Sequence, residues 1–204
     1  MQKHTIINIG RQFGSGGKSV AMALSKLLCI PAYDNELLIE AARESGYSKE
    51  LFEGRDEKRS VFTLSGIFAS STRFGLTESY INDNELFRIQ SEVIRDIAGK
   101  GPAIFVGRAS DYVLRDFKCL DVFITAPLDD RKKRVAERMG ISEDDAAAFI
   151  QKQDRDRKSY YDYFTFGEWG VASNYDLCVD SSILGIDGTA EMIVEFGKKA
   201  GFIL

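Results

Sequence analysis

The sequence contains little of what usually marks a metal centre, a disulfide scaffold or a membrane span. Among 204 residues there is one histidine, His4, and the three cysteines Cys29, Cys119 and Cys178 stand far apart. Isolated thiols without a neighbouring histidine argue against a zinc site or a disulfide framework. No segment approaches the roughly 20 apolar residues that cross a bilayer, and the N-terminus lacks the apolar run of a signal peptide. These absences predict a cytoplasmic protein without a membrane partner.

The chain also has few prolines, no internal repeat and no excess of basic residues. The chain has three prolines and neither a low-complexity tract nor an internal repeat, so nothing indicates a linker between domains. Its 27 basic and 31 acidic side chains give a formal net charge of -4, which argues against nucleic-acid binding. We therefore expect one domain over residues 1–204 that binds neither nucleic acid nor a membrane.

Short, almost continuously apolar runs alternate with helical patterns along the chain. The four clearest runs are 5–9, 103–107, 121–125 and 176–180, and a shorter candidate, "IPAYD", ends at Asp34. Such runs are typical of strands that are covered on both faces of a parallel sheet. Helical spacing recurs at 19–28, 84–98, 129–139, 143–160 and 189–199. The alternation predicts an α/β fold with a five-stranded parallel sheet and helices on both faces, whose ligand lies beyond the carboxyl ends of the strands.

The stretch "GRQFGSGGKS", residues 10–19, nearly matches the phosphate-binding pattern G-x-x-x-x-G-K-[ST] and has Gln12 where the first glycine belongs. A phosphate cradle needs backbone N–H groups that converge at a helix N-terminus, and glycine where φ is positive. Lysine would then reach the β- and γ-phosphates, and the serine hydroxyl would bind Mg²⁺. The alternative is a strand-to-helix turn whose glycines serve tight packing. We predict a working cradle, with phosphate-binding residues Gly14, Ser15, Gly16, Gly17, Lys18 and Ser19, and Ser19 as the metal ligand.

Five segments of the chain resemble the cytidylate kinase-like family. They are "INIGRQFGSGGKSVAMALSKLLCIPAYDNELL", "GRASDYVL", "TAPLDDRKKRV", "DRDRKSYYDYF" and "YDLCVDSSILG", in order over nearly the whole chain. An "SRQFGSGG" element is typical of that family, so the displaced glycine is a family trait. The resemblance implies a three-layer P-loop kinase fold with an acceptor-binding insert near 46–84 and a lid near 129–170. It also implies transfer of the ATP γ-phosphoryl group, with Mg²⁺, to CMP or a related pyrimidine nucleotide.

Arginines concentrate in the expected lid. Arg131, Arg134 and Arg138 recur at helical spacing and share one face, and the planar guanidinium group binds phosphate oxygens in pairs. From the resemblance we expect Arg131 and Arg134 to bind ATP phosphates, and Arg131 and Arg157 to be catalytic together with Lys18. Surface ion pairs with the neighbouring aspartates are the alternative for each arginine.

Three residues are candidates for binding the acceptor. Arg108 follows a predicted strand and a glycine, where the "GRD" arginine of cytidylate kinases contacts the acceptor phosphate. This sequence has "GRA" with Asp111 three residues later, so it is open which carboxylate replaces the family aspartate. Asp34, at the end of "PAYD", would hold the acceptor or a metal-bound water, with a helix N-cap as its alternative role.

The expected insert leaves the acceptor and the oligomeric state open. It carries Phe62, Phe68, Phe74 and Tyr80, which would stack on a base, pack internally or form a dimer contact. Two other functions remain open, a kinase of a non-nucleotide small molecule and a nucleotide-binding regulatory protein with little turnover. A GTPase is disfavoured, because the nearest string to the N-K-x-D base reader is "QKQD" inside a predicted helix.

Overall fold

The computed structural model describes residues 4–44 and 76–203. In this part of the chain, five strands form one parallel sheet: β1 (Ile6–Arg11), β2 (Ala32–Tyr33), β3 (Ala103–Val106), β4 (Leu120–Thr125) and β5 (Leu177–Asp180). Their order is β2-β3-β1-β4-β5, so β1 lies in the centre between β3 and β4. The predicted five-stranded parallel sheet is confirmed, with strand bounds shifted by two residues at most.

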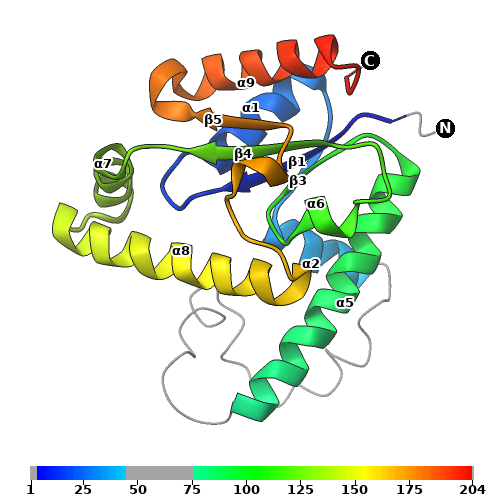
Figure 1. The fold of residues 1–204 in the computed structure, drawn as a ribbon, viewed down its shortest axis with the longest axis horizontal. Coiled ribbons are helices and arrows are strands. Elements are labelled where there is room, and N and C mark those ends of the chain that lie inside the picture. The colour runs from blue at the N-terminus through cyan, green and yellow to red at the C-terminus, as the bar shows by residue number, and fades with distance from the viewer. Residues whose placement is uncertain (1–3, 45–75, 204) are drawn as a thin grey trace. The chain divides into compact units, whose positions relative to one another are not determined.

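Helices cover both faces of this sheet (Figure 1). On one face lie α1 (Gly17–Leu28) and α9 (Ser181–Lys199), which contact each other. Towards the other face lie α8 (Glu143–Thr165) and the short α6 (Ser110–Val113). At one end of the sheet, α7 (Leu128–Met139) follows β4 and packs on α8. A 3-10 turn, η1 (Ala172–Asn174), leads into β5.

The main core lies between the sheet and the α1–α9 layer. Ile7 and Ile9 of β1 are fully buried there against Val20 and Leu24 of α1 and Ile193 of α9. Continuous burial of β1 and β3 explains why their sequences do not alternate. On the opposite face Phe123 packs edge-on against Trp169, with ring centroids 5.3 Å apart.

The chain divides into two compact units, 1–35 with 94–204, and 36–93. The second unit contains most of α2 (Asn35–Glu44) and the larger part of α5 (Leu76–Lys100). Most of the expected acceptor-binding insert, including Phe62, Phe68 and Phe74, lies outside the described residues. Within the described part, no helix is long and apolar enough to span a membrane.

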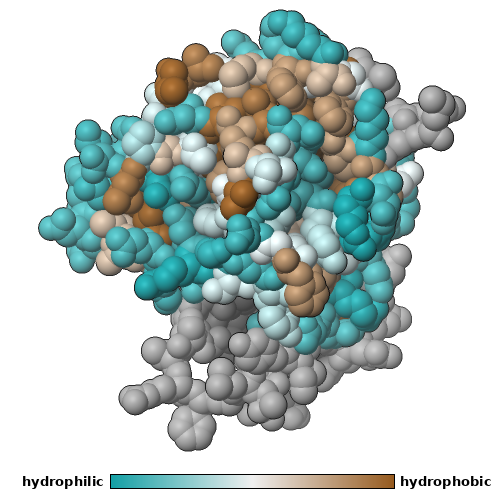
Figure 2. Space-filling view, viewed as in Figure 1, coloured by the Kyte–Doolittle hydropathy of each residue, from teal (hydrophilic) through white to brown (hydrophobic). Residues whose placement is uncertain are grey.

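Three helices begin earlier than their apolar spacing predicts. α1 begins at Gly17 rather than at residue 19, α5 begins at Leu76 rather than at residue 84, and α9 begins at Ser181 rather than at residue 189. In α9 the irregular backbone at Gly185, with φ 69° and ψ -174°, interrupts the helical pattern. Apolar side chains gather at the surface near the start of α9 (Figure 2), where Ile183 and Leu184 are largely exposed. This apolar surface adjoins the loop between β1 and α1, because Ile186 contacts the loop at Gly16.

Candidate active site

The loop between β1 and α1 has the backbone of an anion cradle. Gly14 and Gly16 have φ of 78° and 81°, in the left-handed region that glycine adopts without strain. A Cβ atom on Gly14 would lie 2.9 Å from Val135 Cγ2, and one on Gly16 would lie 2.6 Å from Ile186 Cδ1. Glycine is therefore required for conformation and for space. Gly16 caps α1, and the first N–H groups of a helix point out of its N-terminus towards any anion placed there.

Side chains outside the loop hold its carbonyl groups. The Ser181 hydroxyl at the start of α9 donates to Ser15 O, and the Ser15 hydroxyl donates to Gln12 O at 2.9 Å. Arg134 Nη1 donates to Gly14 O at 3.5 Å and to Ser181 Oγ at 3.2 Å. With its carbonyls turned towards these donors, the loop is fixed by contacts from both α7 and α9.

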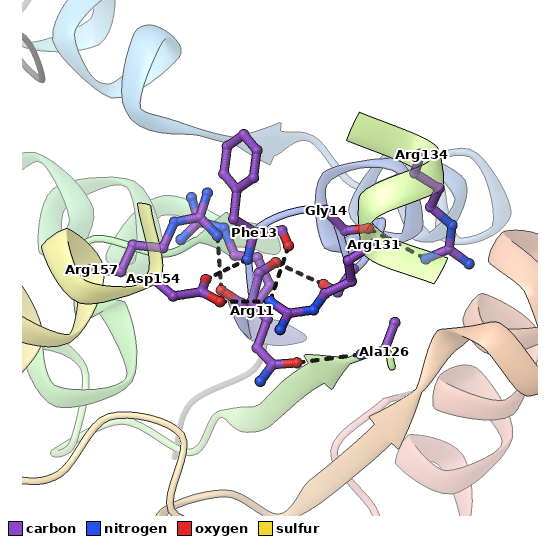
Figure 3. Close-up of polar contacts among 10 residues, drawn as sticks. Arg11, Phe13, Gly14, Ala126, Arg131, Arg134, Asp154 and Arg157 are labelled. Carbon is purple, nitrogen blue, oxygen red and sulfur yellow. Dashed lines mark hydrogen bonds and ion pairs between the residues drawn. The ribbon is translucent and has the colours of Figure 1, made fainter. Parts of the chain in front are cut away.

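Asp154 of α8 links the loop to Arg131 of α7 (Figure 3). One carboxylate oxygen accepts from Phe13 N at 2.7 Å, and the other lies 2.6 Å from Arg131 Nη1. Arg131 is only 9% exposed and also donates to Phe13 O at 3.3 Å. The predicted phosphate ligand Arg131 is thus engaged in an ion pair that joins α7, α8 and the loop.

Phe13 lies among cationic side chains. The guanidinium carbons of Arg138 and Arg157 lie 5.2 and 5.1 Å from its ring centroid, within the range of a cation–π interaction. Arg157 Nη1 donates to Arg11 O at 3.0 Å. Burial lowers the pKa of Arg157 to about 10, partly offset by Asp154. Arg157 therefore remains a cation at neutral pH, but in a poorly hydrated position that favours contact with an anion.

The segment after β3 has an unusual backbone. Gly107, Arg108 and Ala109 all have positive φ, at 74°, 61° and 53°. Two successive non-glycine residues in this region cost about 1–3 kcal/mol each and are most often found at functional sites. The Arg108 guanidinium carbon lies 4.2 Å from the centre of the Tyr160 ring, and Tyr161 donates to Asp111 Oδ2 at 2.7 Å. Burial raises the pKa of Asp111. The predicted acceptor residues Arg108 and Asp111 thus both contact α8.

The structure pairs two predicted site residues with each other. Lys18 Nζ lies 2.6 Å from Asp34 Oδ2, with the lysine side chain 64% exposed and the carboxylate 16% exposed. Ser19, the predicted metal ligand, is exposed on the first turn of α1. Within the described residues, no group of three histidine, cysteine or carboxylate side chains is arranged to hold a metal ion. Asp34 thus places a carboxylate beside the lysine of the loop.

Arg11, the last residue of β1, is a site residue that the sequence analysis missed. Burial and the nearby charges of Arg157 and Arg108 lower its pKa well below the usual range, and Asp34 partly offsets them. The sequence held two signals for it, a charged residue at the end of an otherwise apolar strand and the arginine of the "SRQFGSGG" element. Arg11, Arg108 and Asp34 come from three separate segments and meet at the carboxyl ends of adjacent strands, where ligands of parallel sheets bind.

The sequence comparisons agree with this arrangement. Residues 6–183 match the model of the cytidylate kinase-like family. The chain belongs to this family. A cytidylate kinase from Pyrobaculum calidifontis is 22% identical over 192 residues, which cover 94% of this chain and 91% of the relative. The family thus supports a phosphotransferase that acts on nucleotides.

Solved structures with the same fold as this chain include kinases. A protein of uncharacterised function from Eubacterium ventriosum is 28% identical, with a TM-score of 0.72 over 95% of this chain and 98% of that one. Shikimate kinase from Acinetobacter baumannii is 14% identical, with a TM-score of 0.56 over 98% and 96% of the two chains. That second likeness shows the fold alone, which is the three-layer P-loop kinase fold expected from the sequence.

Proposed function

We propose that the protein is an ATP-dependent nucleoside monophosphate kinase whose acceptor is CMP or a related pyrimidine nucleotide. The observation that carries the proposal is the glycine cradle at the start of α1, enclosed by arginines from α7 and α8. The family match and the relatives named cytidylate kinase support the same reaction. Phosphoryl transfer is mostly positioning and neutralisation of charge, and this site is suited to both.

The donor side of the site consists of the loop and its supports. In the proposal the backbone N–H groups from Gly14 to Ser19 bind the ATP phosphates at the positive end of α1. Arg134 contacts the loop at Gly14 O, and in the proposal its guanidinium group also binds a phosphate oxygen. Arg131 acts chiefly by positioning Phe13, since its Nη1 is already held by Asp154. Arg157 is the proposed catalytic arginine of the lid.

The acceptor side lies at the ends of β2 and β3. In the proposal Arg108 binds the acceptor phosphate, and its strained backbone fixes the direction of the side chain. Asp34 orients the acceptor or a metal-bound water. Asp111 acts on the acceptor only through Tyr161, which it holds by a hydrogen bond of 2.7 Å.

The oxygen ligands that the protein offers here suit the Mg²⁺ ion that accompanies ATP rather than a permanently bound metal. Mg²⁺ is commonly held by one or two carboxylates while phosphates and waters supply its other ligands, and Asp34 is one carboxylate near the cradle. Asp34 and Ser19 are the proposed protein contacts. When bound with the nucleotide, Mg²⁺ neutralises charge on the β- and γ-phosphate oxygens.

A coupled assay of ADP release tests the proposal. The full-length protein is mixed with ATP, Mg²⁺ and single acceptors from a panel of CMP, dCMP, UMP, AMP, GMP and small alcohols. We expect turnover with a pyrimidine monophosphate at least about tenfold above the rate with ATP alone, since chemistry requires a positioned acceptor. Turnover only with a neutral alcohol, or only the slow release seen without acceptor, would contradict the proposed substrate.

A further inference from the structure

The guanidinium group of Arg11 lies at the end of β3, although Arg11 itself belongs to β1. The stem of the side chain passes the start of α1, where a Cβ atom on Gly17 would lie 2.6 Å from Arg11 Cβ and 2.9 Å from Arg11 Cγ. Its far end lies beside Gly107, where a Cβ atom would lie 2.7 Å from Arg11 Cζ and 3.0 Å from Arg11 Nη2. Both glycines leave room for the arginine. The side chain thus carries its charge to the residue that precedes Arg108.

Three cations gather at this point. Arg108 and Arg157 are the like charges that act on the Arg11 guanidinium group, and Asp34 is the carboxylate that opposes them. That carboxylate also lies 2.6 Å from Lys18 Nζ, so one negative charge is shared among several cations. Among residues 4–44 and 76–203, no hydrogen bond or ion pair engages the side chain of Arg11. A half-buried cation in such surroundings is unfavourable unless a ligand supplies negative charge.

The position of this guanidinium group favours the acceptor phosphate over the donor phosphates. In the proposed function the donor phosphates lie at the N–H groups of the loop before α1, with Lys18 directly after Gly17 as the phosphate-loop pattern requires. The acceptor phosphate lies at Arg108. The charged end of Arg11 lies beside Gly107, and only its uncharged stem passes the start of α1. A phosphomonoester carries about two negative charges at neutral pH, and each guanidinium group can bind two of its oxygens. Two arginines therefore match one acceptor phosphate in charge and shape.

We propose that Arg11 binds the phosphate group of the acceptor together with Arg108, and that it makes the site specific for a nucleoside monophosphate over the corresponding nucleoside. Lys18 acts on the donor phosphates. The inference rests on the proposed function, since it adds a specificity residue to the acceptor side of the same site. It concerns binding as well as turnover, so it can be tested in the absence of ATP.

Calorimetric titration with CMP, cytidine and ADP separates the acceptor phosphate from the donor phosphates. Each ligand is titrated into the full-length wild-type protein, Arg11→Met, Lys18→Met and the exposed control Arg115→Met. We expect Arg11→Met to raise the CMP Kd at least about tenfold, because charge-assisted hydrogen bonds are lost, and to change the cytidine and ADP Kd less than about threefold. Lys18→Met should raise the ADP Kd more than the CMP Kd. Arg115→Met should change none of the three.

Thermal unfolding distinguishes a binding role of Arg11 from a structural one. Methionine keeps most of the stem beside Gly17 and deletes the charge, so the ligand-free Arg11→Met variant should unfold at a temperature no lower than the wild-type protein, because repulsion among the three cations is relieved. Saturating CMP should raise the Tm of the wild-type protein more than that of the variant. Arg11→Lys keeps the charge but lacks the planar fork, and it should recover only part of the CMP affinity.

Three results would overturn the inference. They are a wild-type protein that binds CMP no more tightly than cytidine, an Arg11→Met variant that keeps the preference for CMP, and an Arg11→Met variant that loses affinity for ADP as much as for CMP. The last result would assign the guanidinium group to the donor phosphates or to the structure of the loop. Failure of the proposed function has a different outcome, in which CMP binds through Arg11 but no acceptor in the panel is phosphorylated.

Discussion

At the scale of single residues, Asp154 holds the loop between β1 and α1 in place. Its carboxylate joins Phe13 N to Arg131, a guanidinium group that is only 9% exposed. Replacing Asp154 with asparagine keeps the shape but leaves the charge of Arg131 without a counter-charge. We expect the free energy of unfolding to fall by about 2–4 kcal/mol, measured by urea denaturation.

The matched control for Asp154 is Asp129, which pairs with Lys132 on the surface and whose side chain is 80% exposed. Asp129→Asn should change the free energy of unfolding by less than about 1 kcal/mol, as is usual for an exposed ion pair. Equal losses for the two variants would show that the Asp154 clamp is no stronger than a surface contact.

Replacing Arg157 should affect turnover more than nucleotide binding. It is poorly hydrated and lies over the loop, so its interaction with the phosphates should strengthen as charge develops in the transition state. Arg157→Ala should lower kcat by roughly a hundredfold while the ADP Kd rises several times less. Lys199→Ala, at a side chain 82% exposed, is the control, and an equal loss of kcat in both variants would favour a surface role for Arg157.

At the scale of elements, the cradle depends on how the loop turns into α1. Gly16→Ala places a side chain at φ 81° and against Ile186. We expect a loss of about 1–2 kcal/mol in the free energy of unfolding and a weaker ADP affinity, since the first N–H groups of α1 are displaced. Gly99→Ala, in a helix and with open space around its Cβ, should be neutral or stabilising, up to about 1 kcal/mol. A Gly16→Ala variant with unchanged ADP binding would contradict the cradle.

The elements themselves followed from the sequence better than their ends. The apolar runs predicted the sheet because a strand that is covered on both faces buries nearly every side chain and is therefore apolar along its whole length. The starts of α1 and α9 were missed because glycine-rich and serine-rich turns carry no apolar spacing. Arg11 was missed for a different reason. Its neighbours Gly107 and Arg108 are brought to it by the pairing of β1 with β3, which is a long-range contact that local patterns do not reveal.

At the scale of the whole molecule, one half-buried carboxyl group, that of Asp121, should govern part of the pH dependence of stability. Asp121 accepts a hydrogen bond from Asn8 at 2.8 Å in the middle of the sheet. Burial raises its pKa to about 6, with Asn8 acting in the opposite direction and Asp111 and Asp176 adding to the rise. Above an unfolded-state pKa near 4, the folded protein binds this proton more tightly than the unfolded chain. Stability from this group therefore falls as pH rises from about 4 to 6, and the full penalty remains above that range.

The variant Asp121→Asn removes this penalty while keeping an acceptor for Asn8. We expect it to be more stable than the wild-type protein at pH 7.5, by about 1–3 kcal/mol, and the difference to shrink towards pH 4. Denaturant unfolding at both pH values measures this. Asp116→Asn, at a side chain 69% exposed, should show no such trend, and a constant difference for Asp121→Asn would mean that the carboxyl group ionises normally.

The central claim is that this protein moves a phosphoryl group from ATP to a nucleoside monophosphate at the loop before α1. The most direct measurement is ³¹P NMR of the protein with ATP, Mg²⁺ and CMP, which reports both products at once. The account predicts that ADP and CDP resonances grow together in equal amounts while the CMP resonance declines. Growth of ADP with inorganic phosphate and unchanged CMP would show hydrolysis instead of transfer, and would contradict the account.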